Sequence, residues 1–199
     1  AGLRAKLSLP PEGPLIGCFG RVRPQKGTDV FLDAIGRVFR DVPDAKALVM
    51  GRATREHAAY MKQLKATVDH AGLSRRVIFR DEVPIEQLVS HFQALDLYVA
   101  PQRWEGFGLT PLEAMACGVP VIATKAGAFE EIVLEGQTGH LVDVEDAMQM
   151  AERIGAMLAD PQCRDAYAIN ARKHMLAHFT IEAEAAAITE VYRKLLASD

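Results

Sequence analysis

Two glutamates flank a glycine-rich turn near the middle of the chain. Glu105 and Glu113 lie on either side of the turn 106–108, within the stretch RWEGFGLTPLEAMACGVPVIAT (103–124). The glycines of the turn allow the backbone to approach a ligand closely, and a helix that begins near Gly108 would point its amides at an anion. Amides bind phosphate, whereas carboxylates accept hydrogen bonds from ribose and sugar hydroxyls. The stretch therefore favours a ligand that carries both phosphate and sugar.

Three cations lie in an earlier loop, GRVRPQKGTD (20–29). Arg21, Arg23 and Lys26 precede Thr28, which we expect to be the N-cap of the next helix. Cations beside a helix N-terminus form a good site for a diphosphate. The spacing of a P-loop is missing from this stretch, and a solvated basic loop is the alternative interpretation.

Both glutamates also have a purely structural interpretation. The sequence TPLE fits a capping box, with Thr110 as N-cap, Pro111 at the first helical position and Glu113 at the third. For Glu105 the alternative is a plain surface glutamate. The stretch GFGLTP is not a dinucleotide-binding fingerprint, because Pro111 occupies the position of the third glycine.

Short apolar segments alternate with helical patterns and predict the elements that must position these loops. Each segment is nearly continuous in apolar character, as parallel strands covered on both faces are. The predicted strands are 15–19, 46–50, 76–80, 96–100, 119–123 and 139–142. This alternation predicts an α/β fold, with a Rossmann-like parallel sheet of about six strands and helices on both faces.

Three helical segments without an intervening strand follow the last predicted strand and form a C-terminal helical tail, at 145–159, 162–177 and 181–197. In open parallel sheets, ligands bind at the carboxyl ends of the strands, where loops lead into helices. This rule selects the loops 20–28, 51–55, 81–84, 101–110 and 124–129. The first and fourth of them contain the residues discussed above.

Composition argues against several classes of protein. The chain has 199 residues and a net charge of -3, so a basic field for nucleic acid is not expected. No apolar run approaches the roughly 18 residues of a membrane span, and the start lacks the apolar core of a signal peptide. Cys18, Cys117 and Cys163 are widely spaced, which predicts neither disulfides nor a zinc ribbon and fits a reducing cytoplasm. His174 and His178 share a helical face without an evident third ligand, so no metal site is predicted.

Taken together, these stretches resemble the nucleotide-sugar-binding C-terminal domain of GT-B glycosyltransferases of family 4, also called group 1. The resemblance covers about residues 14–197 and includes the segments EAMACGVPVIAT and GAFEEIVLEGQTGHLV. Its most specific residues are Gly20, Arg21 and Lys26, together with the Glu-x7-Glu motif from Glu105 to Glu113.

The resemblance implies a role for each matching residue. Arg21 and Lys26 would bind the donor diphosphate and stabilise it as the leaving group, and Glu105 would hold hydroxyls of the donor sugar. These three are the predicted catalytic residues. The remaining residues would bind the donor through the base, ribose, phosphate or sugar: Gly20, Val83, Phe107, Gly108, Leu109 and Glu113. Glu113 is the expected ribose ligand, and Val83 lies where the backbone of the family meets the base.

The resemblance also implies a division of the chain and a missing partner. Residues 1–13 would be an interdomain linker or a cloning remnant, and 14–178 the nucleotide-sugar-binding domain. Residues 179–199 would form a helix that crosses to an N-terminal, acceptor-binding domain of the same enzyme. We expect the chain by itself to bind nucleotide sugar weakly and to transfer nothing.

The implied activity is glycosyl transfer from an NDP-sugar with retention of configuration, without a metal or other cofactor. The stretch PQRWEGFGLTPLEAMACGVPVIAT most resembles lipopolysaccharide-core mannosyltransferases, which implies GDP-mannose as donor and a glycan or lipid-linked acceptor. The expected location is the cytoplasm, with peripheral contact at the inner face of the membrane. Two alternatives stay open. A sugar-nucleotide epimerase of related fold would need acid–base carboxylates, and a non-catalytic nucleotide-binding module would need an acidic cluster at the strand ends.

Overall fold

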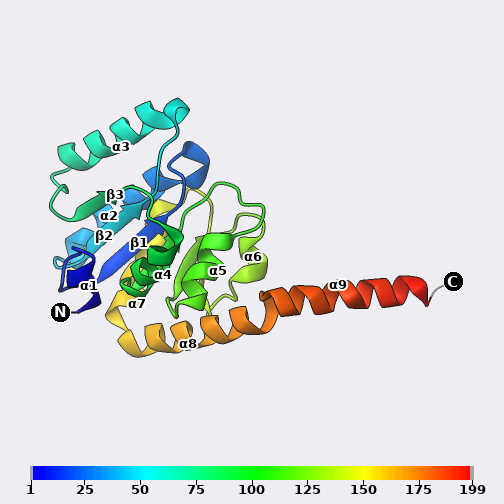
Figure 1. Cartoon of the computed structure of the whole chain (residues 1–199). Helices are drawn as coiled ribbons and strands as arrows, with labels where there is room; N and C mark the ends of the chain where they lie inside the picture. The colour runs from blue at the N-terminus through cyan, green and yellow to red at the C-terminus, as the bar shows by residue number, and fades with distance from the viewer. Residues whose placement is uncertain (1, 198–199) are drawn as a thin grey trace.

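The computed structural model describes residues 2–197 and contains one parallel sheet among them (Figure 1). The spatial order of its strands is β3-β2-β1-β4-β5-β6, and every neighbouring pair is parallel. The strands are β1 Leu15–Phe19, β2 Lys46–Met50, β3 Val77–Arg80, β4 Leu97–Ala100, β5 Val121–Thr124 and β6 Gly139–Val142. The predicted fold class is confirmed.

The strands are short and apolar because both of their faces are covered. Every residue of β1, β4 and β5 is buried, as expected for the central strands of a parallel sheet. The observed ends differ from the predicted ones by two residues at most. The largest difference is at β5, which begins at Val121 because Pro120 has no N–H to donate to a neighbouring strand.

Helices pack on both faces of the sheet and enclose two separate cores. One core lies under α2 (Thr28–Asp41), α3 (Ala58–His70) and α7 (Ala147–Ala159). The other lies under four helices: α4 (Ile85–Gln93), α5 (Leu109–Ala116), α6 (Phe129–Ile132) and α8 (Pro161–His178). Successive strand residues alternate between the cores, so that Ile16 faces the first and Leu15 the second.

The N-terminal segment is folded onto the body of the protein. It contains the short helix α1 (Leu3–Lys6). Arg4 forms an ion pair with Asp96 at 2.6 Å, and the same carboxylate accepts a hydrogen bond from the N–H of Leu15 at 2.7 Å. Leu9 is buried. These contacts lie at the amino ends of β1 and β4, and the role of residues 1–13 as a linker stays a prediction.

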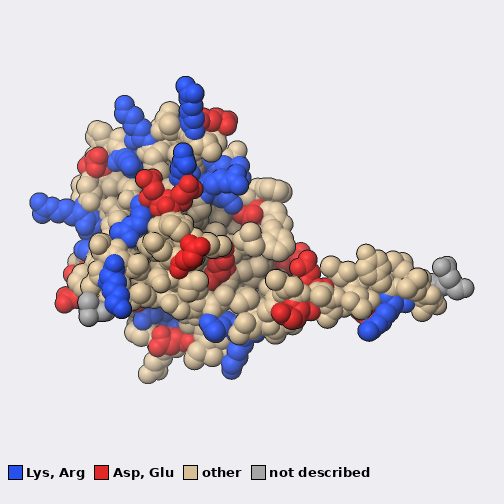
Figure 2. All heavy atoms as spheres, viewed as in Figure 1, with Lys and Arg blue, Asp and Glu red and all other residues tan. Residues whose placement is uncertain are grey.

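The last helix, α9 (Ile181–Leu196), projects from the body as an arm (Figure 1). Its N-cap Thr180 accepts a hydrogen bond from the N–H of Ala183, and no residue within the helix is buried. Large apolar side chains are exposed along it: Ile181, Ile188, Val191, Tyr192, Leu195 and Leu196. In Figure 2 most of the arm is uncharged, whereas cations and anions are interspersed on the visible face of the body. Residues 1 and 198–199 of the predicted terminal segments lie outside the described part of the chain.

Within residues 2–197, no helix combines the length and the apolar character needed to cross a membrane.

Candidate functional site

The strand order places two loops side by side at the carboxyl edge of the sheet. The chain runs outward from β1 in one direction and from β4 in the other, and these two strands are neighbours. Ligands bind at such a switch point, between the loops that leave the two central strands. Here those loops are 20–27, which contains the short 3-10 helix η1 (Pro24–Lys26), and 101–108. They are two of the loops that the sequence analysis selected, and the two whose residues it singled out.

The two loops join through Lys26 and Glu105. The Nζ atom of Lys26 lies 2.5 Å from Oε2 of Glu105, and both side chains are largely buried. The other carboxylate oxygen accepts hydrogen bonds from the N–H groups of Gly106 and Phe107, at 3.1 and 3.4 Å. Burial alone would raise the pKa of Glu105, but the hydrogen bond and charge of Lys26 together with these N–H groups hold that pKa below its ordinary value. Glu105 is therefore ionised at neutral pH and is not a plain surface glutamate.

Gly108 starts the helix α5 and decides what its first turn can bind. Gly108 is the N-cap with φ +93, and no side chain caps the helix. A Cβ atom at this position would lie 2.5 Å from Cδ1 of Ile132. The first-turn N–H groups of a helix have no partner within the helix, so the uncapped turn of α5 offers amides to an anion.

The two predicted side-chain caps are wrong for the same reason. In α5 the left-handed conformation of Gly108 starts the helix two residues earlier than the capping-box prediction, which places Thr110 inside the first turn. In α2 the N-cap is Gly27, with φ +66, and Thr28 is buried as the first helical residue. A Cβ atom at position 27 would lie 1.8 Å from the carbonyl oxygen of Pro101. Glycine is needed there because the two loops touch.

Glu113 lines a cavity of about 200 Å³ at the same edge of the sheet. The cavity brings together four of the predicted site residues: Gly20, Arg21, Val83 and Glu113. Apolar side chains form much of the rest, among them Met50, Leu88 and Phe92. No described residue donates a hydrogen bond to the carboxylate of Glu113 or forms an ion pair with it, and burial raises its pKa. Its carboxylate thus remains able to accept hydrogen bonds from a ligand.

Phe107 and Leu109 present their side chains to a different hollow. Both are largely exposed, and they line an apolar depression of about 500 Å³ between α5 and the junction of α8 with α9. Ile181, the first residue of α9, lines it too. Glu113 lines this depression as well as the cavity of about 200 Å³, so the two hollows share that residue.

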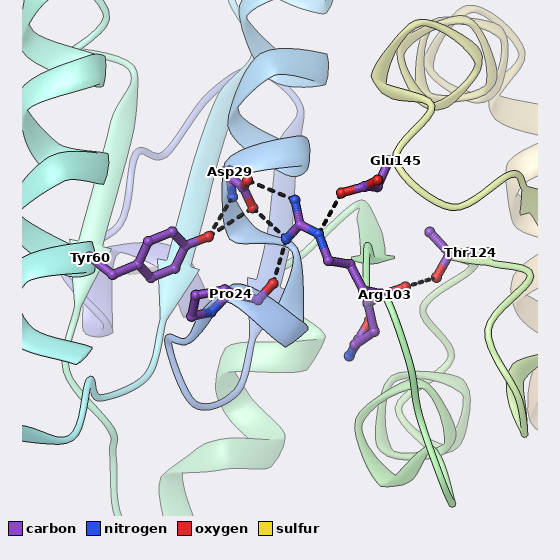
Figure 3. A network of polar contacts seen from close by, with 7 residues as sticks. Pro24, Asp29, Tyr60, Arg103, Thr124 and Glu145 are labelled. Atoms are coloured by element: carbon purple, nitrogen blue, oxygen red, sulfur yellow. Dashed lines mark hydrogen bonds and ion pairs between the residues drawn. The ribbon is translucent and has the colours of Figure 1, made fainter. Parts of the chain in front are cut away.

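Sequence reasoning missed several charged residues at this edge. Arg52 and Glu82 form an exposed ion pair of 3.4 Å, and both line the cavity of Glu113. Arg103 reaches from the loop after β4 to Asp29 in the first turn of α2 (Figure 3). The only signal in the sequence was position, since Arg103 lies two residues before Glu105 and Asp29 lies three residues after Lys26.

Other groups do not form sites at this edge. Among residues 2–197, no set of three or more His, Cys, Asp and Glu side chains lies close enough to hold a metal ion. The rings of His174 and His178 are 4.9 Å apart, and burial together with the second ring lowers the pKa of His174. Two larger surface hollows, of about 550 and 670 Å³, lie along α2 beside α3 and α7. They do not include the loops that meet at the switch point.

Comparison with known proteins gives the family. The model of the family "Glycosyl transferases group 1" matches residues 2–174. A lipopolysaccharide core biosynthesis mannosyltransferase, LpcC of Rhizobium leguminosarum bv. viciae, is 46% identical over 186 residues. That match covers 94% of this chain and 52% of the relative. The chain thus spans about half the length of the curated relatives it matches.

Solved structures agree on the fold. The C-terminal domain of the group 1 glycosyl transferase LpcC from Francisella tularensis superimposes with a TM-score of 0.84 at 34% identity, over 90% of this chain and 92% of that one. The Anabaena protein HepE, in complex with UDP, superimposes with a TM-score of 0.87 at 30% identity, over 96% of this chain and 51% of that one. The family model over residues 2–174 and the match to the Francisella domain lead to the same conclusion: the chain belongs to the group 1 glycosyltransferase family.

Proposed function

We propose that this chain is the donor-binding half of a retaining, metal-independent glycosyltransferase that moves mannose from GDP-mannose to an acceptor of the lipopolysaccharide-core type. One observation carries the proposal. The loops that follow β1 and β4, together with α5, supply the cations Arg21 and Lys26, the uncapped first turn of α5 and two carboxylates, with Arg21 and Glu113 lining one cavity and Lys26 paired with Glu105. A nucleoside diphosphate sugar needs both kinds of group.

The nucleoside would occupy the cavity of about 200 Å³. Its ribose hydroxyls would donate hydrogen bonds to Glu113, whose carboxylate has no partner among the described residues. The base would lie against the apolar side of the cavity, near Val83 and Leu88. The diphosphate would extend toward Arg21, Lys26 and the amides of α5.

The donor sugar would lie against Glu105, which is ionised and held in place by backbone N–H groups. As the bond between the anomeric carbon and the diphosphate oxygen breaks, negative charge builds on the diphosphate. Arg21 and Lys26 would neutralise that charge, which is the reason for proposing that no metal is needed. The acceptor oxygen would bond to the same carbon, and its proton would pass to an oxygen of the departing diphosphate. Retention of configuration is proposed from the family resemblance.

The finer identity of the donor and acceptor rests on the relatives. The Rhizobium relative is described as a mannosyltransferase of lipopolysaccharide core biosynthesis, and a relative from Mycolicibacterium smegmatis is described as a GDP-mannose-dependent mannosyltransferase. HepE, which was solved with UDP, supports the same kind of site but a different base. Guanine and uracil are therefore the two bases that an experiment must separate.

The proposal includes a second domain. The chain spans 52% of the LpcC relative, and α9 exposes a row of apolar side chains without a partner in the described structure. We propose that α9 packs on the N-terminal, acceptor-binding domain of the same enzyme, and that this chain transfers nothing without it. The proposed setting is the cytoplasm, at the inner face of the membrane where lipid-linked acceptors are presented.

Calorimetric titration of this chain with GDP, UDP, ADP and GDP-mannose tests the donor. We expect selective binding of GDP and GDP-mannose, lost in the Arg21→Ala variant. Selective binding of UDP or ADP would keep the site and discard the mannosyl assignment. If a folded sample binds none of the four, titration of the two-domain enzyme decides whether the other half is needed, and failure there would overturn the proposal.

Replacing Glu113 with glutamine should raise stability while weakening nucleotide binding. Burial raises the pKa of Glu113, so the folded chain holds its proton more tightly than the unfolded chain does. The contribution of Glu113 to the free energy of unfolding is therefore greatest at acid pH, where the group is protonated, and it falls as pH rises through the raised pKa. Glutamine stays neutral, so the Glu113→Gln variant does not suffer this destabilisation at neutral pH. Loss of the charged acceptor should weaken GDP binding about ten- to a hundredfold.

Thermal unfolding and calorimetry at neutral pH measure both effects. Glu152→Gln, an exposed site on α7, serves as the matched control and should change neither quantity. A Glu113→Gln variant that binds GDP as tightly as the parent chain would remove Glu113 from the donor site.

A further inference from the structure

Arg103 lies at the centre of a polar network that joins three loops at the carboxyl edge of the sheet (Figure 3). Its Nη1 and Nη2 atoms donate hydrogen bonds to the two carboxylate oxygens of Asp29, at 3.0 and 2.9 Å. Nη1 also donates to the carbonyl oxygen of Pro24, and Nε donates to Glu145 at 2.7 Å. The guanidinium thus holds the loop after β1, the first turn of α2 and the loop after β6 at the same time.

The backbone around Arg103 ties the same loops together. The N–H of Arg103 donates to the carbonyl oxygen of Gln25 at 2.9 Å. The preceding carbonyl, of Gln102, accepts a hydrogen bond from the hydroxyl of Thr124 at 2.5 Å. Gln25 is the residue before Lys26, and Arg103 is two residues before Glu105. Each member of the Lys26–Glu105 pair therefore lies within two residues of an atom that the network fixes.

Asp29 is itself held from its other side. The hydroxyl of Tyr60, on α3, donates to Oδ1 of Asp29 at 2.7 Å. Burial alone would raise the pKa of Asp29, but the hydrogen bonds from Arg103 and Tyr60 hold that pKa below its ordinary value. The carboxylate is therefore charged at neutral pH and remains a partner for Arg103. A guanidinium bound by both oxygens of a carboxylate is fixed in its plane as well as in its distance.

Glu145 is the last member of the network, and its backbone conformation is strained. It is one of two described residues other than glycine with a positive φ, at +66, a conformation that costs free energy for such residues. Its side chain is more than half exposed, so burial does not hold it there. The hydrogen bond to Arg103 is the contact that its side chain makes.

We propose that Arg103 is a positioning residue: by clamping the loop after β4 onto the loop after β1, it sets the distance and orientation between Lys26 and Glu105. The inference builds on the proposed function, because the pair matters for transfer only if it binds the donor. A lysine on a flexible four-carbon stem cannot fix the loops by itself, since one ammonium–carboxylate contact leaves orientation open. The fork between Arg103 and Asp29 supplies the missing constraint.

The test compares Arg103→Ala and Asp29→Asn with a matched control. Arg37→Ala removes another arginine–aspartate contact on α2, the exposed pair with Asp33, without touching either loop. The first measurement is a carbon-13 NMR titration of the Glu105 carboxyl in this chain, assigned by comparison with Glu105→Gln. The second is kcat and KM for the donor in the two-domain enzyme.

We expect Arg103→Ala and Asp29→Asn to move the pKa of Glu105 up toward its ordinary value, because Lys26 is no longer held against it. Arg37→Ala should leave this pKa unchanged. In the two-domain enzyme, kcat should fall about tenfold for Arg103→Ala, the scale expected when a reacting group is displaced by less than an ångström. Arg103→Lys should not restore it, because an ammonium cannot reproduce the fork.

An unchanged pKa of Glu105 in both variants, with stability lowered, would show that Arg103 only stabilises the fold and would overturn the inference. If Arg103→Ala fails to fold, Asp29→Asn carries the test, since it keeps the shape of the side chain and removes its charge. If the pKa moves as expected but neither this chain nor the two-domain enzyme binds a nucleoside diphosphate, the positioning role stands and the proposed function fails.

Discussion

An Arg21→Ala variant of the two-domain enzyme should lose turnover by about 10²–10³-fold, or about 2.7–4 kcal/mol of transition-state stabilisation. Arg21 is exposed at the mouth of the cavity that also contains Glu113. Its guanidinium can bind two phosphate oxygens at once, and in the proposed reaction the charge on those oxygens grows as the sugar departs. The loss should therefore appear mainly in kcat.

Steady-state kinetics with saturating acceptor measures this loss. Arg75→Ala, at an exposed position before β3, is the matched control and should leave kcat unchanged. Because Arg21 is exposed, the fold should tolerate its removal, and a normal circular dichroism spectrum would establish that. Normal turnover of the Arg21→Ala enzyme would contradict the assignment of Arg21 to the donor site.

A Glu105→Gln variant should lower turnover by about 10²-fold, because it removes the charged acceptor for sugar hydroxyls and also releases Lys26. The 2.5 Å contact to Lys26 involves two side chains that are largely buried. With glutamine in place, the ammonium of Lys26 would lose its ionic partner. Kinetics of the two-domain enzyme, with Glu152→Gln as control, measures the loss. Turnover within twofold of the parent enzyme would contradict the role of Glu105.

For the Glu105→Gln variant we also predict that its difference in stability from the parent chain depends on pH. The folded pKa of Glu105 is below its ordinary value of 4.5, so the folded chain releases this proton more readily than the unfolded chain does. The stabilisation from Glu105 is then full above pH about 4.5 and is lost as pH falls through the lowered folded pKa. Urea unfolding should find the parent chain more stable than Glu105→Gln at pH 7. The difference should shrink in acid, and a constant difference would argue against the lowered pKa.

The strands could be predicted from sequence because each is a short apolar run that is buried on both faces. The order of the strands could not be obtained from any local pattern. The contact between Lys26 and Glu105 depends on that order, because it exists only where β1 and β4 are neighbours. The resemblance assigned each residue a role, and those roles stay predictions. The pairing itself came from the structure.

The predicted first residues of two helices were wrong for a different physical reason. Thr28 and Thr110 have the side chains of good N-caps, but the backbone turns into each helix one or two residues earlier, at Gly27 and Gly108. Long-range contacts leave no room for a Cβ atom at either position, because Pro101 lies against Gly27 and Ile132 lies against Gly108. Arg103 was missed because an isolated arginine in a loop has many possible partners, and its partner Asp29 is 74 residues away in sequence.

The two cores on opposite faces of the sheet have a consequence for how the protein can evolve. Lys26 leads into α2, which belongs to one layer, and Glu105 precedes α5, which belongs to the other. The contact between Lys26 and Glu105 therefore depends on how the two layers are aligned. If the pair binds the donor as proposed, a substitution that slides either helix slightly along the sheet would alter catalysis before it altered folding. Sequence drift in each core is then constrained by the opposite one.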